Sequence, residues 1–143
     1  MCTSLTYTDA NGAVYFGRTL ELDVDEPYVV VFCPTGESFR SEVDGHDPVE
    51  FTAAHSFLAV SAPGRLPTDD APLAREDLKV SEGLNDAGLT FSLLAYPSAG
   101  GGEPAGEINR AMLQASDLGA WVLSQFANVE EVKAALAEQP IFL

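Results

Sequence analysis

Few residues of this 143-residue chain combine a reactive side chain with an informative position, and Cys2 is the first of them. An initiator Met before a small residue is generally removed, and its removal would leave Cys2 at the N-terminus. A free α-amino group titrates near pH 7.7–8.0, so one residue would hold both a thiol nucleophile and the base that accepts its proton. The sequence therefore points to nucleophilic catalysis by Cys2 that needs no side-chain base.

The two histidines and the second cysteine are weaker candidates. His46 lies in the acidic Asp44–Asp47 stretch and is expected at the surface, and His55 falls inside a predicted strand. Cys33 closes an apolar segment, which favours a buried thiol over a second nucleophile. We expect no metal site at Asp44, His46 and Asp47, because the chain offers no second cluster of ligands. No other cofactor is expected either.

Composition and charge exclude several classes of partner. Seven basic and 22 acidic residues give a net charge of −15, which opposes binding to nucleic acids and to anionic membranes. With 46% hydrophobic and 20% charged residues, the chain is expected to fold as a single domain over 1–143. The longest apolar runs are far shorter than the roughly 20 residues that span a bilayer, and no secretory signal is recognisable. These features predict a cytoplasmic protein whose cysteines stay reduced.

Strands are expected over the first two thirds of the chain. The Asn11-Gly12 pair between two β-prone segments predicts a hairpin that begins near Thr3. The apolar run at 28–33 reads as a central strand buried on both faces. Further along, we expect a surface loop at 35–48, a strand at 51–60, a second loop at 63–72 and another strand at about 89–96.

Helices are expected between about residues 108 and 139, where the apolar period changes to 3.6. One helical face would hold Leu118, Trp121, Val122, Gln125 and Phe126, of which only Gln125 is polar. Strands followed by helices, without alternation, indicate an α+β layered architecture.

A second helix is predicted to start at Asn128, because Glu131 follows at the spacing of a capping box. Its apolar residues Val129, Val132 and Leu136 would face inward. The chain then ends on three apolar residues that read as the beginning of a strand.

Four segments carry a resemblance to a known family. They are MCTS at 1–4, FGRTLE at 16–21, EGLNDAGL at 82–89 and WVLSQFANVEEVKAAL at 121–136. In this order and spacing they resemble the choloylglycine hydrolase family, the N-terminal-nucleophile (Ntn) cysteine hydrolases that include bile salt hydrolases and penicillin V acylases. The resemblance implies an αββα four-layer sandwich, of which this chain would be the N-terminal part. It also implies a thiolate that attacks a linear amide and forms an acyl-enzyme.

The same resemblance assigns roles to individual residues. Cys2 would be the nucleophile, and Arg18 would lie beside the sulfur and favour the thiolate. Glu21 would orient the N-terminal amine, where the family usually has Asp. The backbone N–H of Ala95 would contribute to the oxyanion hole, at a position where bile salt hydrolases carry Asn and penicillin V acylases carry Tyr. Asn85 is read as a structural turn residue.

Family members are longer than this chain, so we expect a fragment, a truncated gene product or one half of a split enzyme. Its partners would be a small-molecule N-acyl amide and a missing C-terminal half or second chain, and a homo-oligomer is also open. Conjugated bile salts, penicillin V, N-acyl amino acids and acyl homoserine lactones all stay open as substrates. The alternatives are a non-catalytic binding domain derived from such a hydrolase, or an unrelated acidic interaction domain. A large exposed apolar face would favour the incomplete hydrolase over a self-sufficient module.

Overall fold

The computed structural model describes residues 2–20, 26–94 and 111–142, in which strands come first and helices follow. In chain order the elements are β1 (Thr3–Thr8), β2 (Val14–Thr19), β3 (Val29–Cys33), β4 (Ser38–Ser41), β5 (Val49–Thr52), β6 (Phe57–Ser61), η1 (Arg75–Asp77), β7 (Val80–Asn85), β8 (Thr90–Ser92), β9 (Leu113–Gln114), η2 (Ala115–Asp117), α1 (Leu118–Gln125), α2 (Val129–Leu136) and β10 (Ile141–Phe142), where η marks a 3-10 helix. None of the described helices is long and apolar enough to cross a membrane.

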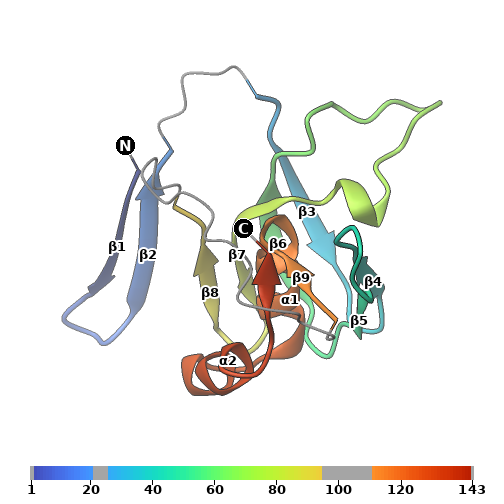
Figure 1. The fold of residues 1–143 in the computed structure, drawn as a ribbon. Coiled ribbons are helices and arrows are strands. Elements are labelled where there is room, and N and C mark those ends of the chain that lie inside the picture. The colour runs from blue at the N-terminus through green and yellow to red at the C-terminus, as the bar shows by residue number, and fades with distance from the viewer. Residues whose placement is uncertain (1, 21–25, 95–110, 143) are drawn as a thin grey trace.

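The first two strands form the antiparallel hairpin that the sequence predicts, and Figure 1 shows it standing beside the rest of the fold. The carboxylate of Asp9 accepts the backbone N–H groups of Asn11 and Ala13 at 2.8 and 2.9 Å, which closes the turn. Gly12 has a φ of 83°, a conformation that side chains with a Cβ rarely adopt. The register runs from the Thr3–Thr19 pair to the turn.

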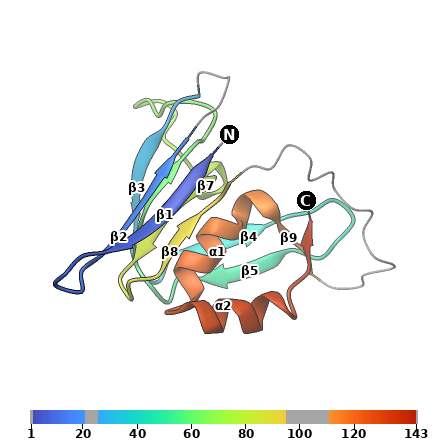
Figure 2. The same ribbon diagram turned by 90° about the vertical axis from the view of Figure 1, so that its left-hand side faces the viewer.

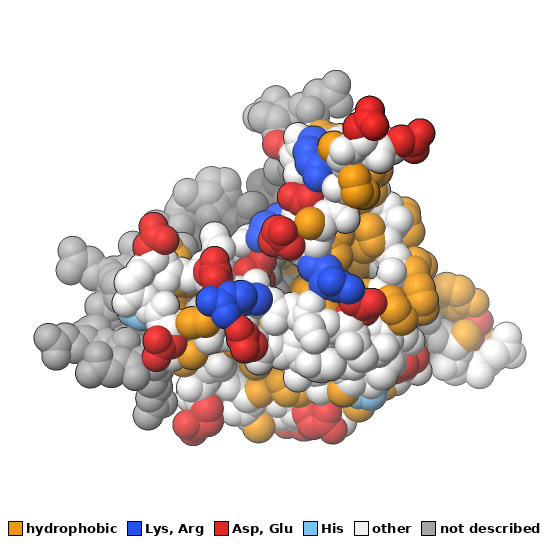
Figure 3. Space-filling view, turned by 90° about the vertical axis from the view of Figure 1, so that its right-hand side faces the viewer, with side chains coloured by type: hydrophobic (Ala, Val, Ile, Leu, Met, Phe, Trp, Pro, Cys, Tyr) orange, Lys and Arg blue, Asp and Glu red, His pale blue; other side chains and the backbone are white. Residues whose placement is uncertain are grey.

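A four-stranded antiparallel sheet in the order β3-β6-β7-β8 forms the centre of the molecule. The prediction that 28–33 is a central strand buried on both faces is wrong, because among the described strands β3 pairs with β6 alone and lies at the sheet edge. Alternate side chains of β3 face a side of the sheet that no described element covers there, and Val30 and Phe32 are 70% and 67% exposed. Figure 3, which views the β3 side, shows a strip of hydrophobic side chains along that flank.

Helix α1 covers the other face of this sheet, and Figure 2 shows it between the sheet and the β4–β5 pair. The helix approaches closely because two glycines lie in the contact. A Cβ on Gly83 of β7 would lie 2.6 Å from Leu123 Cδ1, and one on Gly119 would lie 2.8 Å from the Phe91 ring. Because the helix packs against both layers, its residues from Gly119 to Ser124 are all buried.

Strands β4 and β5 form a short hairpin that closes the core with aromatic side chains. The Phe39 and Phe51 rings stack at 5.2 Å, and Phe57 lies 6.2 Å from Phe39. Two predictions fail here. The expected loop at 35–48 contains β4, and the expected strand at 51–60 breaks into β5 and β6 with His55 in the turn between them. The backbone N–H of His55 donates to Ser124 O, which ties that turn to α1 rather than to a neighbouring strand.

The strand expected at about 89–96 is shorter than predicted within the described residues, since β8 ends at Ser92. Strand β7, over Val80–Asn85, was not predicted as a strand. The turn that connects β7 to β8 contains Gly88, whose φ of 87° fits the expected turn motif.

Helix α2 begins at the predicted cap. The Asn128 side chain accepts the Glu131 N–H at 3.0 Å, and the Glu131 carboxylate accepts the Ala127 N–H at 2.8 Å. Val132 packs against the core, as predicted. Val129 and Leu136 are exposed, so the prediction that they face inward is wrong: the helix lies at the lower edge of the molecule, where one side of it meets the core (Figure 2).

The end of the chain folds back onto an earlier segment. Ile141 and Phe142 form β10, which pairs in parallel with β9. The predicted start of a strand at this position is confirmed. The expected helix start near residue 108 lies outside the described residues. From residue 111 on, the first helical elements are η2 and α1, because Leu113 and Gln114 are strand residues.

Candidate active site

Cys2 precedes β1 and is half-buried beside the open end of the hairpin. The register pairs Ser4 with Arg18, and side chains two apart along a strand point to the same face. When the alternation of β1 is continued by one residue beyond Thr3, the Cys2 side chain falls on the face that carries Arg18. Cys2 and Arg18 are then diagonal neighbours across the two strands. The hairpin thus puts the two residues that the sequence singled out on one surface.

Arg18 connects the hairpin to the central sheet. Its side chain is only 4% exposed. Nη1 donates to the backbone carbonyls of Leu93 at 2.9 Å and Ser81 at 3.4 Å, and Nε donates to Thr19 O at 3.3 Å. Among the described residues Nη2 has no hydrogen-bond partner although it is buried. The guanidinium is therefore held in place while one of its donor groups remains available.

Glu82 of β7 is the ionic partner of Arg18, with 3.7 Å between its Oε2 and Arg18 Nε. The cross-strand pairs place Glu82 on the uncovered face of the sheet, with Val60 on one neighbouring strand and Ser92 on the other. A carboxylate within an apolar face is costly unless it is paired. Sequence analysis gave this residue no role, although a single acid on the apolar side of a strand is a signal that could have been read.

A groove of about 700 Å³ separates the hairpin from the sheet. Its walls are mainly apolar, and the charged side chains that line it are Arg18 and Glu82. The lining residues from the hairpin are Thr6, Val14, Phe16, Gly17 and Arg18, and those from the sheet strands and the β7–β8 turn are Val30, Leu58, Ala59, Val60, Glu82, Gly83, Leu84, Gly88 and Thr90. An elongated apolar group could lie here with a polar group near Arg18.

Two of the predicted site residues, Glu21 and Ala95, lie outside the described residues. Arg18 donates to the carbonyl of Leu93, the residue that follows β8. The described residues contain no cluster of three or more His, Cys, Asp or Glu side chains that could hold a metal ion.

Cys33 lies apart from this site, in the core beneath the sheet. It is buried, and burial raises the pKa of its thiol, with the charge of Arg75 opposing that effect. The prediction that Cys33 is a buried apolar residue is confirmed.

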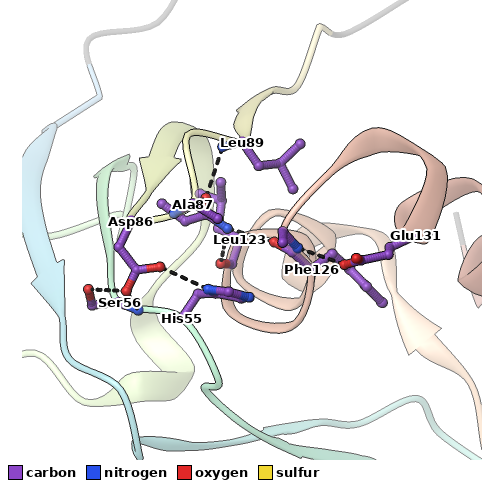
Figure 4. Close-up of polar contacts among 10 residues, drawn as sticks. His55, Ser56, Asp86, Ala87, Leu89, Leu123, Phe126 and Glu131 are labelled. Carbon is purple, nitrogen blue, oxygen red and sulfur yellow. Dashed lines mark hydrogen bonds and ion pairs between the residues drawn. The ribbon is translucent and has the colours of Figure 1, made fainter.

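Asn85 has a structural role, as predicted, and the four residues that bond to its side chain are labelled in Figure 4. The side chain is buried and makes four of them: Nδ2 donates to Leu123 O at 3.0 Å and to Phe126 O at 2.7 Å, and Oδ1 accepts the N–H groups of Ala87 at 3.2 Å and Leu89 at 2.9 Å. Every donor and acceptor of the amide is thereby satisfied within the protein.

A second polar cluster, also in Figure 4, lies next to this turn. Asp86 accepts from the Ser56 hydroxyl at 2.8 Å and from the Ser56 N–H at 3.0 Å, and its other oxygen lies 2.8 Å from His55 Nδ1. These bonds lower the pKa of the Asp86 carboxyl, the Ser56 hydroxyl contributing most. The Ser56 hydroxyl bonds to the carboxylate and not to the imidazole, so the geometry is that of a turn and not of a nucleophile with its base.

Solved structures define the class of fold. Penicillin V acylase from Agrobacterium tumefaciens superposes with a TM-score of 0.76 at 20% identity over 99% of this chain. The C2A mutant of the conjugated bile acid hydrolase from Clostridium perfringens gives 0.72 at 25% identity, and its R18L variant gives 0.69 at 23%, each over 99% of this chain. Each comparison covers 39% of the other chain. The fold is the N-terminal part of the αββα sandwich of Ntn hydrolases.

The chain belongs to the choloylglycine hydrolase family: the model of the linear amide C-N hydrolases, choloylglycine hydrolase family, matches residues 2–142. Curated relatives include a conjugated bile acid hydrolase from Lactobacillus acidophilus, 31% identical over 137 residues, and a bile salt hydrolase/transferase from Clostridium perfringens, 29% identical over 136 residues. Each alignment covers 95% of this chain, which spans 39% and 37% of the length of these two relatives.

Proposed function

We propose that this chain carries the nucleophile of a linear amide hydrolase and that Cys2, after removal of Met1, is that nucleophile. The observation that carries the proposal is the hairpin register, which pairs Ser4 with Arg18 at an apolar groove and, continued by one residue, brings Cys2 to the face of Arg18. Arg18 Nη2 is buried and has no hydrogen-bond partner among the described residues. A fixed cation beside a thiol favours the thiolate, the form that attacks. The solved Clostridium perfringens structures include a C2A mutant and an R18L variant, so that hydrolase has a cysteine and an arginine at the same positions, 2 and 18, as this chain.

The proposed reaction has two halves. The α-amine of Cys2 takes the thiol proton while the sulfur attacks the amide carbonyl carbon. The resulting tetrahedral oxyanion collapses, the C–N bond breaks, and the protonated amine delivers its proton to the leaving nitrogen. Water then attacks the thioester with the same amine as base, which releases the carboxylic acid and restores the thiol.

The other predicted residues have supporting roles in this proposal. The Arg18 guanidinium stabilises the thiolate, and the Glu21 carboxylate orients the N-terminal ammonium formed in each half-reaction. The backbone N–H of Ala95 stabilises the oxyanion, a role that does not depend on the side chain. The longer side chain of Glu21, compared with the usual Asp, still offers the same acceptor oxygens.

The proposed substrate class is an N-acyl compound with an apolar acyl group, such as a conjugated bile salt, penicillin V or an N-acyl amino acid. The apolar walls of the groove support an apolar acyl group, because such surface binds by removing apolar area from water. The relatives named as bile acid hydrolases and the structural match to a penicillin V acylase support the same range of substrates.

The uncovered face of the central sheet favours a larger catalytic unit over a self-contained binding module. Val30, Phe32, Leu58 and Leu84 are large apolar side chains exposed on that face. Contiguous exposed apolar patches in soluble proteins often mark interaction surfaces. Val30, Leu58 and Leu84 also line the groove, so we infer that further layers of the sandwich form the outer wall of the groove in the active enzyme and leave its Arg18 end for the substrate. We also infer that these 143 residues alone hydrolyse no amide at a useful rate. Loss of a single oxyanion-hole donor already costs about 10²–10³ in turnover.

The test is co-expression of this chain with the remaining part of a related hydrolase, followed by size exclusion and an amine-release assay on a panel of acyl amides. We expect a soluble complex with activity, loss of Met1 by intact mass, and no activity for Cys2→Ala. Cys33→Ala is the matched control and should retain activity. An active complex that keeps Met1 would contradict the mechanism. A soluble, inactive monomer that does not associate with the added part would favour the alternative of a non-catalytic binding domain.

A further inference from the structure

Glu82 is unusual for its position on the sheet. By register it shares the uncovered face with Val30, Phe32, Leu58, Val60, Leu84, Thr90 and Ser92. It is thus the one charged side chain among the described strand residues of that face. Its side chain is 31% exposed, whereas that of Arg18 is 4% exposed. The pair therefore joins a nearly buried cation to a carboxylate that solvent still reaches.

The carboxylate contributes little to the placement of Arg18. Three backbone carbonyls already receive hydrogen bonds from the guanidinium, at 2.9 to 3.4 Å, whereas the Glu82 oxygen lies 3.7 Å from Nε. Backbone groups are held by the strands that carry them. The influence of Glu82 is thus mainly that of its charge on the guanidinium and its surroundings.

This charge opposes the effect of Arg18 on a thiolate at Cys2. One cation would face two anions, and a carboxylate that neutralises part of the guanidinium leaves less of its field for the sulfur. The facing surfaces of the hairpin and the sheet offer no other charged group in their described strand residues, since their remaining members are apolar, Ser or Thr. Among the described strand residues Glu82 and Arg18 are therefore the charged pair at this end of the groove, to which the proposed site adds the Cys2 α-amino group and the Glu21 carboxylate.

We propose that Glu82 acts on Cys2 through Arg18: its carboxylate moderates the positive field of the guanidinium and so helps to set the pH at which Cys2 becomes reactive. This inference rests on the proposed role of Cys2. A moderated field would keep the sulfur more basic and hence more nucleophilic than a fully stabilised thiolate, because nucleophilicity falls as a thiolate is stabilised.

The test is the rate of alkylation of Cys2 by iodoacetamide from pH 5 to 10, followed by peptide mass spectrometry on the 143-residue chain. Wild type, Glu82→Gln and Glu82→Asp are compared. Glu50→Gln is the matched control, because it removes a carboxylate that pairs with a different arginine, Arg40, at the surface. Circular dichroism and intact mass verify that all variants share one fold and one N-terminus.

For Glu82→Gln we expect the pH of half-maximal alkylation to fall by about one unit, as the field of Arg18 is no longer offset. Below its pH of half-maximal alkylation, Glu82→Gln should alkylate at Cys2 only about threefold faster than wild type. Its larger thiolate fraction is partly offset by the lower nucleophilicity of a more stabilised thiolate. Glu82→Asp should restore most of the wild-type profile, and Glu50→Gln should match wild type.

The outcomes separate this inference from the proposed function. If Cys2 of the wild type reacts more slowly than Cys33, the proposed function fails. If Cys2 is reactive but its profile is the same in Glu82→Gln, or moves to higher pH, the moderating role of Glu82 is wrong while the proposed function stands.

Discussion

The Asn85 amide donates to the Phe126 carbonyl at 2.7 Å and thereby joins the turn after β7 to the end of α1. The two residues are 41 positions apart in sequence. Because the same amide also bonds to Leu123 O and to two backbone N–H groups of the turn, one side chain determines how the sheet and the helix meet.

Replacement of this side chain should therefore affect stability and not chemistry. Asn85→Ala leaves buried carbonyls and N–H groups without partners, and we expect the free energy of unfolding to fall by about 3 kcal/mol in urea titrations. Asn11→Ala, in the exposed hairpin turn, is the control and should change it by less than about 0.5 kcal/mol. A fully stable Asn85→Ala whose Cys2 has lost its reactivity would instead make Asn85 part of the site.

The close approach of β7 and α1 gives a second prediction. In Gly83→Ala the new Cβ would lie 2.6 Å from Leu123 Cδ1 and 2.7 Å from Leu58 O, and a backbone oxygen cannot move aside cheaply. We expect a loss of about 2 kcal/mol in the free energy of unfolding. Gly17→Ala in β2 is the matched control, since its Cβ would meet nothing within 4 Å. Equal stability of the two variants would contradict the packing described for α1.

Asp86 should make stability depend on pH in the acid range. Its bonds to Ser56 and His55 lower the pKa of the carboxyl in the folded state, so their contribution is present above the unfolded value of about 3.9 and is lost as the pH falls through the folded value. In thermal unfolding between pH 6 and pH 2, the Tm of wild type should exceed that of Asp86→Asn at pH 6. The two Tm values should converge as the pH approaches 2. Asp70→Asn lies in an exposed loop, and its Tm should change with pH in the same way as that of wild type.

Arg18 should control the reactivity of Cys2 alone. In Arg18→Ala the iodoacetamide rate of Cys2 at neutral pH should fall about threefold, as the cation that favours the thiolate is lost and the thiol becomes more basic. The rate of the buried Cys33 should not change. Arg40→Ala, which removes an exposed arginine, is the control. An unchanged Cys2 rate in Arg18→Ala would assign Arg18 to structure only.

Local sequence signals predicted local structure well. Asn11-Gly12 located the hairpin and Asn128 with Glu131 located the start of α2, because each signal acts through bonds within a few residues. The burial of Cys33 was also predictable from its position at the end of an apolar segment.

The failures concern the way distant segments meet. The apolar run of β3 reads the same for a buried central strand and for an edge strand, and only its partners decide between them. Val129 and Leu136 have the spacing of an inner face, yet α2 turns only part of that face toward the core. The pairing of Glu82 with Arg18 joins β7 of the central sheet to β2 of the separate hairpin, and no local pattern reveals that contact.

The hairpin of β1 and β2 buries little of its own surface, since every residue of β1 is exposed, and Arg18 is one side chain that ties it to the sheet. Units with few buried contacts open at a lower free-energy cost than the core does. The segment that carries Cys2 is therefore a separate cooperative unit, able to detach while β6, β7 and α1 remain folded. Its amide protons should exchange with solvent through local opening, well before those of the central sheet.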